Sequence, residues 1–218
     1  QPVVGFLIDG TSSIDSRVED TTYREAGIDQ IELTLEFMKP DQKFSVGFFG
    51  TTPHYFNGGQ AMNATPENIA KANEFLESMR TAKFGDDEFI YNAMMALNSG
   101  AAQKAFFIFT DEDISLDGKD DQEEIKDEVA YAKQNKIPLY IKPLGGSKDA
   151  TIEMMAKETN GGVLDKTITA KKVLDQLKSE LRKIEAELKI EIEKAKKKMA
   201  ERLERLKQQA ATGKIHCP

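Results

Sequence analysis

The fold of this chain is decided by residues 3–13, which read VVGFLIDGTSS. An apolar run from Val3 to Ile8 stops abruptly at Asp9, and four small residues follow. Such a run is typical of a strand buried on both faces, because a parallel sheet covered by helices leaves no face for polar residues. In open α/β sheets, ligands bind at the carboxyl ends of the strands, which is where Asp9 would lie.

Asp9, Thr11 and Ser13 carry side-chain oxygens at alternate positions of the segment that ends this strand. In an extended or turning loop, these three oxygens can converge on one point. An oxygen-only cluster suits a hard cation, Mg²⁺ or alternatively Mn²⁺ or Ca²⁺, better than Zn²⁺ or copper. The same residues could instead form a turn in which Asp9 and Ser12 accept hydrogen bonds from nearby backbone.

A second stretch of the same design favours the cation site. Residues 105–113 read AFFIFTDED, so another apolar run ends in a hydroxyl and a carboxylate, Thr110 and Asp111. Two strands that each deliver an aspartate to the carboxyl edge of a sheet would place Asp9 and Asp111 in one pocket. The fold and the proposed cation site both depend on these two strands lying side by side.

Charge is unevenly distributed along the 218 residues. Residues 1–170 carry 16 Lys or Arg against 29 Asp or Glu, a net charge of −13, whereas residues 171–207 carry 13 against 8, a net of +5. An acidic globular part would repel phosphates, which argues against nucleic-acid binding and is compatible with cation binding. The basic tail could meet an acidic protein surface or an anionic membrane, so membrane contact stays open.

The localisation stays unknown from the sequence. Cys217 is the single cysteine, so no internal disulfide is possible, which is compatible with a reducing compartment. No apolar stretch approaches the ~18–20 residues needed to span a bilayer. Because the sequence begins at Gln1 rather than Met, we expect a processed product or a trimmed fragment.

Predicted strands and helices alternate along residues 3–170. Apolar β-rich runs predict strands at 3–8, 44–49, 105–109 and 137–144, with short strands at 54–56 and 163–164. Helical spacing and helix-start signals predict helices at 23–38, 66–79, 89–98, 120–134 and 147–158, and a polar loop at 14–22. This alternation predicts an α/β, doubly wound, mainly parallel sheet with helices on both faces.

A long helix from about Thr169 follows this domain. Its apolar residues are separated by 3, 4, 3, 4, 4, 3, 4, 4 and 3 positions: Leu174, Leu177, Leu181, Ile184, Leu188, Ile192, Ala195, Met199, Leu203 and Leu206. We expect an α/β domain at 1–180, a projecting, coiled-coil-like helix at 181–212 and a frayed tail at 213–218. A projecting amphipathic helix needs a partner, so it predicts homo-oligomerisation or docking. The alternative is a helix that folds back on its own domain.

The chain resembles the von Willebrand factor A domain family over residues 3–180. The resemblance lies in the strand leading to Asp9, Thr11 and Ser13, the strand leading to Thr110 and Asp111, and the order of the intervening helices. It implies a Rossmann-like fold and a metal-ion-dependent adhesion site that binds a divalent cation, usually Mg²⁺. It also implies a protein-interaction module in which an acidic residue of the partner completes the metal shell.

The middle loop departs from this family pattern. The family has a threonine there, whereas Thr81 stands several residues too early and the loop reads Asp86, Asp87 and Glu88. We expect Asp87 to join Asp9, Thr11, Ser13 and Asp111 around the ion. Each added like charge at ~4 Å costs several kcal/mol at an effective dielectric near 20, so this site would attract an acidic ligand less. It could then hold a structural ion, bind a partner by another surface, or bind no metal.

Enzymatic alternatives find little support in the sequence. Asp-Gly-Thr after an apolar strand also resembles phosphoryl-transfer enzymes of the haloacid-dehalogenase type, but their nucleophilic aspartate would stand at Leu7. There is no phosphate-binding Gly-x-x-x-x-Gly-Lys-Ser/Thr loop. His54, His216 and Cys217 are too scattered for a zinc site. We therefore predict a non-enzymatic, cation-carrying interaction module, with a metal-free structural domain as the alternative.

Overall fold

The structure is a computed structural model that describes residues 2–18, 21–85, 90–111, 119–145, 150–164 and 171–211. The chain divides into two compact units, residues 1–171 and 172–218, which are described separately. In the first unit, strands and helices alternate: β1 (Val3–Asp9), η1 (Ser12–Asp15), β2 (Arg17–Val18), β3 (Thr21–Thr22), α1 (Tyr23–Phe37), β4 (Lys43–Phe49), β5 (His54–Tyr55), η2 (Phe56–Gly59), β6 (Met62–Asn63), α2 (Pro66–Met79), α3 (Ile90–Gly100), β7 (Ala105–Thr110), α4 (Lys119–Asn135), β8 (Leu139–Pro143), α5 (Ala150–Glu158) and β9 (Gly162–Val163).

The central sheet has the strand order β5-β4-β1-β7-β8-β9, and β6 also pairs with β4. The four long strands and β9 are parallel, whereas the short strands β5 and β6 run antiparallel to β4. The predicted mainly parallel α/β sheet is therefore confirmed. Strand β1 lies in the middle, buried along nearly its whole length, as its continuous apolar run predicts.

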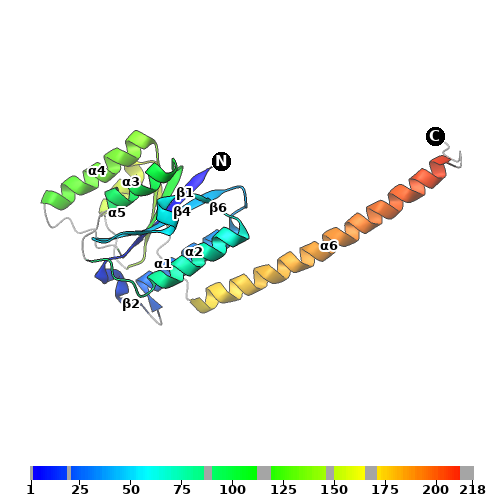
Figure 1. Ribbon diagram of the computed structural model, residues 1–218, viewed down its shortest axis with the longest axis horizontal. Helices are drawn as coiled ribbons and strands as arrows, with labels where there is room; N and C mark the ends of the chain where they lie inside the picture. The colour runs from blue at the N-terminus through cyan, green and yellow to red at the C-terminus, as the bar shows by residue number, and fades with distance from the viewer. Residues whose placement is uncertain are drawn as a thin grey trace. The chain divides into compact units, whose positions relative to one another are not determined.

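Helices cover both faces of this sheet (Figure 1). On one face, α1 and α2 pack through their buried apolar residues against Phe6, Ile8, Phe44 and Phe48. On the other face, the core joins residues of α3, α4 and α5 to Leu7, Phe49 and the inward side chains of β7 and β8. The doubly wound architecture is confirmed.

The helix starts follow the local signals of the sequence. Thr22 caps α1 by accepting a hydrogen bond from the backbone N–H of Glu25, and the Glu25 carboxylate accepts one from the backbone N–H of Thr22. Thr65 caps α2, with Pro66 at its first turn. Both helices begin where the sequence predicts.

Two local expectations are corrected by packing. The sequence predicts a polar loop at 14–22, but Ile14 is fully buried in η1, and β2 pairs with β3. Strand β8 is shorter than the predicted 137–144, because Pro138 lies before its start and Pro143 closes it. The prolines stand at the ends of β8, where a missing N–H does not interrupt the ladder.

The second unit consists of α6 (Lys171–Ala211), one continuous helix of 41 residues (Figure 1). Its large apolar side chains from Ile184 to Leu206 are half exposed or more. The expected helix start at Thr169 and the tail at 213–218 lie outside the described residues. Within the described part of the chain, no helix combines the length and apolar character needed to cross a membrane.

Candidate metal site

Asp9 lies at the carboxyl end of β1, where the sheet register brings it to β7. Ile8 pairs with Phe109, so the next residues along the two strands, Asp9 and Thr110, meet at the same edge. Thr110 Oγ1 donates a hydrogen bond to Asp9 Oδ2 over 3.2 Å. The condition on which the site depends, that β1 and β7 are neighbours, is met.

The segment after β1 folds back onto Asp9. Asp9 Oδ1 accepts hydrogen bonds from the backbone N–H of Thr11 at 2.8 Å and from its hydroxyl at 2.7 Å. Thr11 has an extended backbone and η1 begins at the next residue, so the Ser13 hydroxyl lies 3.0 Å from Thr11 Oγ1. Because the Thr11 hydroxyl donates its only proton to Asp9, the Ser13 hydroxyl is the donor to Thr11, and one lone pair of Thr11 Oγ1 is left for a cation.

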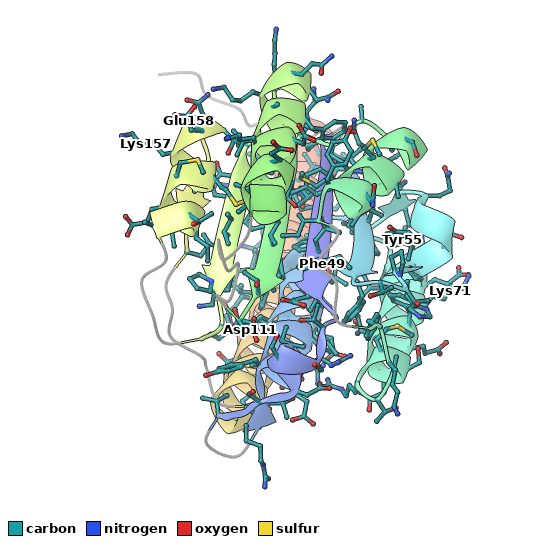
Figure 2. All side chains as sticks on the ribbon, turned by 90° about the vertical axis from the view of Figure 1, so that its left-hand side faces the viewer. Phe49, Tyr55, Lys71, Asp111, Lys157 and Glu158 are labelled. Carbon is teal, nitrogen blue, oxygen red and sulfur yellow. The ribbon has the colours of Figure 1, made fainter. Side chains whose placement is uncertain are left out.

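Asp111 follows the end of β7 (Figure 2). Its Oδ1 is buried and has no hydrogen-bond partner within the described residues. Asp9 is fully buried, and no Lys or Arg of the described residues forms an ion pair with either carboxylate. A buried carboxylate oxygen that has neither a hydrogen-bond donor nor a cation beside it lowers the stability of the fold.

The pKa of Asp9 is raised from its ordinary 3.8 to about 6. Burial is the main cause, and the nearby charge of Asp111 raises it further, whereas the hydrogen bonds from Thr11 and Thr110 lower it. A bound divalent cation would stabilise the ionised form of Asp9. The donor set of two carboxylates and two hydroxyls fits a hard cation.

Of the five predicted ligands, Asp9, Thr11 and Ser13 are joined by hydrogen bonds, and Asp111 lies close enough to Asp9 to raise the pKa of Asp9. The fifth, Asp87, lies outside the described residues, as do Asp86 and Glu88. Within the described residues, no group of three or more His, Cys, Asp or Glu side chains could hold a metal. A cation bound here would have two described carboxylates, Asp9 and Asp111, and the hydroxyl oxygens of Thr11 and Ser13 as candidate ligands.

Arg24 is a site residue that sequence reasoning missed. Its side chain is 2% exposed and binds both oxygens of Asp15, with Nε to Oδ1 at 2.6 Å and Nη2 to Oδ2 at 3.0 Å. It also donates to the carbonyls of Gly10 at 3.3 Å and Ala82 at 3.0 Å. Arg24 therefore joins the segment after β1 to the segment after α2.

Phe84 and Gly10 complete this junction. The guanidinium of Arg24 lies 4.9 Å from the centre of the Phe84 ring. Gly10 N donates to the Phe49 carbonyl at 2.8 Å, and a Cβ on Gly10 would collide with the Phe84 ring and that carbonyl. The sequence does carry a signal for the burial of Arg24. This residue stands four positions before Ile28, so it lies on the apolar stripe of α1.

Known proteins resemble this chain in structure. A scan of protein-family models found no match to the sequence, and a search of curated proteins found none either. Among solved structures, a von Willebrand factor type A protein from Catenulispora acidiphila matches 81% of this chain at a TM-score of 0.59 and 15% identity. This chain spans 40% of the length of that protein.

Two Bacteroides proteins match over nearly their whole length. BatB, a conserved hypothetical protein from Bacteroides thetaiotaomicron, has a TM-score of 0.57 and 16% identity, with 84% of this chain and 100% of that one covered. An aerotolerance-related membrane protein from Bacteroides fragilis has a TM-score of 0.53 and 20% identity, with coverages of 81% and 98%. At these low sequence identities, structural similarity establishes the fold alone. The α/β unit of this chain has the von Willebrand factor A-type fold.

Proposed function

We propose that the α/β unit is a non-enzymatic protein-interaction module, of adhesion or scaffold type, that carries one divalent cation at the carboxyl edge of its sheet. Asp9, Thr11, Ser13 and Asp111 would hold Mg²⁺, or alternatively Mn²⁺ or Ca²⁺, with Asp87 as a further ligand. The observation that carries the proposal is the buried Oδ1 of Asp111, which has no hydrogen-bond partner among the described residues, on an acid close enough to Asp9 to raise the pKa of Asp9.

The partner would be a protein that offers an acidic side chain. Mg²⁺ takes near-octahedral coordination and keeps positions that its protein ligands do not fill. A carboxylate from the partner could take such a position, while Asp9, Thr11, Ser13 and Asp111 orient the ion. Residues 181–212 would serve as a helical extension for self-association or docking.

Two other functions have weaker support. Phosphoryl transfer through an aspartyl intermediate needs a carboxylate at position 7, but Leu7 is a fully buried core residue. A metal-free structural domain would leave the buried Asp9 and the buried Oδ1 of Asp111 without a counter-ion among the described residues. That arrangement is costly, so a bound cation explains the two carboxylates better.

Calorimetric titration with Mg²⁺, Mn²⁺ and Ca²⁺ tests the cation site. We expect one site per chain, and at least a tenfold weaker affinity in the Asp9→Asn and Asp111→Asn variants, because each loses a charged ligand of nearly unchanged shape. Asp41→Asn is the matched control, since Asp41 is an exposed acid in the turn before β4. Binding of none of the three ions, or equal weakening in all three variants, would refute the cation site.

The Asp87→Ala variant tests the middle loop separately. Weaker cation binding in this variant would support Asp87 as a ligand, because removal of a charged ligand lowers affinity. Unchanged binding would limit the site to Asp9, Thr11, Ser13 and Asp111.

Acetate serves as the simplest carboxylate probe of partner binding. With Mg²⁺ present, acetate should shift the amide resonances of Thr11 and Asp111, and chelation of the ion should abolish the shift. Shifts of equal size with and without Mg²⁺ would count against a carboxylate-completed metal shell.

A further inference from the structure

The apolar seam of α6 has a repeat of its own. Along the described helix the seam residues are separated by 4, 4, 3, 4 and 4 positions: Ile184, Leu188, Ile192, Ala195, Met199 and Leu203. A 3-4-4 spacing is an 11-residue repeat with 3.67 residues per turn, close to the 3.6 of a straight helix. This seam therefore runs along one face of α6 almost without drift.

The spacing of the seam reads the same in both directions. The centre of the seam lies between Glu193 and Lys194. Two positions whose residue numbers sum to 387 lie equally far from this centre, on opposite sides of it. Ile184 corresponds to Leu203, Leu188 to Met199, and Ile192 to Ala195. Position 206 is a leucine and corresponds to position 181, which is also a leucine in the sequence.

The charge of the helix has the opposite sign on the two sides of this centre. Residues 180–193 carry five Glu against three Lys or Arg, a net charge of −2, whereas residues 194–207 carry seven Lys or Arg against two Glu, a net of +5. A helix of this pattern attracts a second copy of itself that runs in the opposite direction.

We propose that α6 pairs with α6 of a second copy of this chain, antiparallel and seam to seam, about a two-fold axis between positions 193 and 194. Glu191 and Lys198 each stand one position before a seam residue, so they lie on the same flank of the seam. Glu191 of one copy then lies within two positions of the level of Lys198 of the second. The ion pair that Glu191 forms within one chain, with Lys194, is exposed and weak enough to rearrange.

A parallel, in-register pair would be unfavourable. The basic half of one helix, residues 194–207 with a net charge of +5, would then lie along the basic half of the other, and like charges repel. The apolar seam alone permits both directions, whereas the charges select the antiparallel one.

The seam side chains are free to form such a contact. Ile184, Leu188, Ile192, Met199 and Leu203 are each at least 50% exposed in the described chain. Burial of a continuous apolar stripe against a second helix is the usual way in which a long amphipathic helix is stabilised.

The pairing has a consequence for the α/β units. The amino-terminal ends of the two helices, to which these units are attached, would lie at opposite ends of the pair, roughly 65 Å apart along its axis at 1.5 Å per residue. Each dimer would carry two copies of the proposed cation site. Simultaneous binding of both sites to one partner surface would raise the effective affinity.

Sedimentation of the full chain tests the self-association. We expect a dimer for the unaltered protein and a dissociation constant raised at least tenfold in the Leu188→Glu variant. Ile190→Glu is the matched control, because Ile190 is 55% exposed, like Leu188 at 56%, but lies on the face of α6 opposite the seam. A monomer at every concentration, or equal weakening in the two variants, would overturn the proposal.

Disulfide trapping tests the direction of the pair in a Cys217→Ser background. A mixture of the Leu188→Cys and Met199→Cys proteins should form a mixed disulfide, since these positions face each other in the antiparallel pair. Leu188→Cys alone should not cross-link, because two copies of position 188 would lie about 16 Å apart, beyond the ~7 Å between Cα atoms that a disulfide allows. A disulfide between two copies of position 188 would overturn the antiparallel arrangement.

This inference develops the self-association part of the proposed function and is independent of the cation site. Mg²⁺ titration of the Leu188→Glu variant should match that of the unaltered protein. If the unaltered protein binds the cation but stays monomeric, the helix pair alone is refuted, and if it dimerises but binds no cation, the cation site alone is refuted.

Discussion

The hydroxyl of Thr110 donates a hydrogen bond of 3.2 Å to the carboxylate of Asp9, across 101 residues of sequence. This bond joins the carboxyl ends of β1 and β7, and with the two bonds from Thr11 it occupies both oxygens of a fully buried acid. Asp111, the next residue after Thr110, is thereby held beside the same acid. The candidate metal site is thus built on the pairing of two strands.

The Thr110→Val variant tests this bond, because valine keeps the shape of threonine and removes its donor. We expect the free energy of unfolding to fall by about 1 kcal/mol and the pKa of Asp9 to rise further. Urea denaturation and NMR titration of the Asp9 carboxyl measure the two effects. Thr34→Val is the control, since the exposed Thr34 hydroxyl bonds to the Gln30 carbonyl of its own helix; the same loss in both variants would contradict the prediction.

The stability of the metal-free protein should depend on pH through Asp9. The pKa of Asp9 is about 6 in the folded chain against an ordinary 3.8, so the folded state holds this proton more tightly than the unfolded state. The stabilisation is complete below about pH 4 and is lost as the pH rises through about 6, a loss on the order of 3 kcal/mol.

The Asp9→Asn variant isolates this contribution, because asparagine does not titrate. The difference in unfolding free energy between the unaltered protein and the variant, measured with chelator present, should change between about pH 4 and pH 7. A constant difference over this range would show that Asp9 keeps its ordinary pKa.

Arg24→Met should destabilise the α/β unit by about 2–4 kcal/mol, since the buried carbonyls of Gly10 and Ala82 lose their donor. The Asp15→Asn variant should cost less than Arg24→Met, because asparagine keeps an acceptor for the guanidinium and both carbonyls keep their donor. Denaturation measures both, and cation titration of Arg24→Met should show weaker binding because the segment from Gly10 to Asp15 loses its anchor. Equal stability of the two variants would mean that the carbonyl contacts of Arg24 contribute little.

Gly10→Ala should destabilise the protein by about 1–3 kcal/mol, because the added methyl group meets the Phe84 ring and the Phe49 carbonyl. Gly162→Ala is the matched control, since a Cβ there would lie 3.8 Å from the nearest atom of Tyr140, an ordinary contact. We expect the control to change the unfolding free energy by less than about 0.5 kcal/mol. Thermal unfolding of both variants checks the prediction, and a neutral Gly10→Ala would show that Phe84 can move aside.

Local pattern was sufficient to predict most of the elements. The apolar runs before Asp9 and Thr110 predict buried strands, and the threonines that precede α1 and α2 mark their starts. Each of these signals acts within a few residues of sequence, so it can be read without the fold. Ile14 was missed because its burial depends on η1 folding onto the core, which no local pattern records.

The sequence by itself determined which residues could bind a hard cation, since Asp9, Thr11, Ser13 and Asp111 each end or follow an apolar strand. Only the tertiary structure decided that β1 and β7 are neighbours, and that Arg24 turns from the apolar stripe of α1 to hold the segment after β1. The physical reason is distance along the chain. Hydrogen-bonded register and burial are set by contacts between residues far apart in sequence, whereas helix caps and apolar runs act between near neighbours.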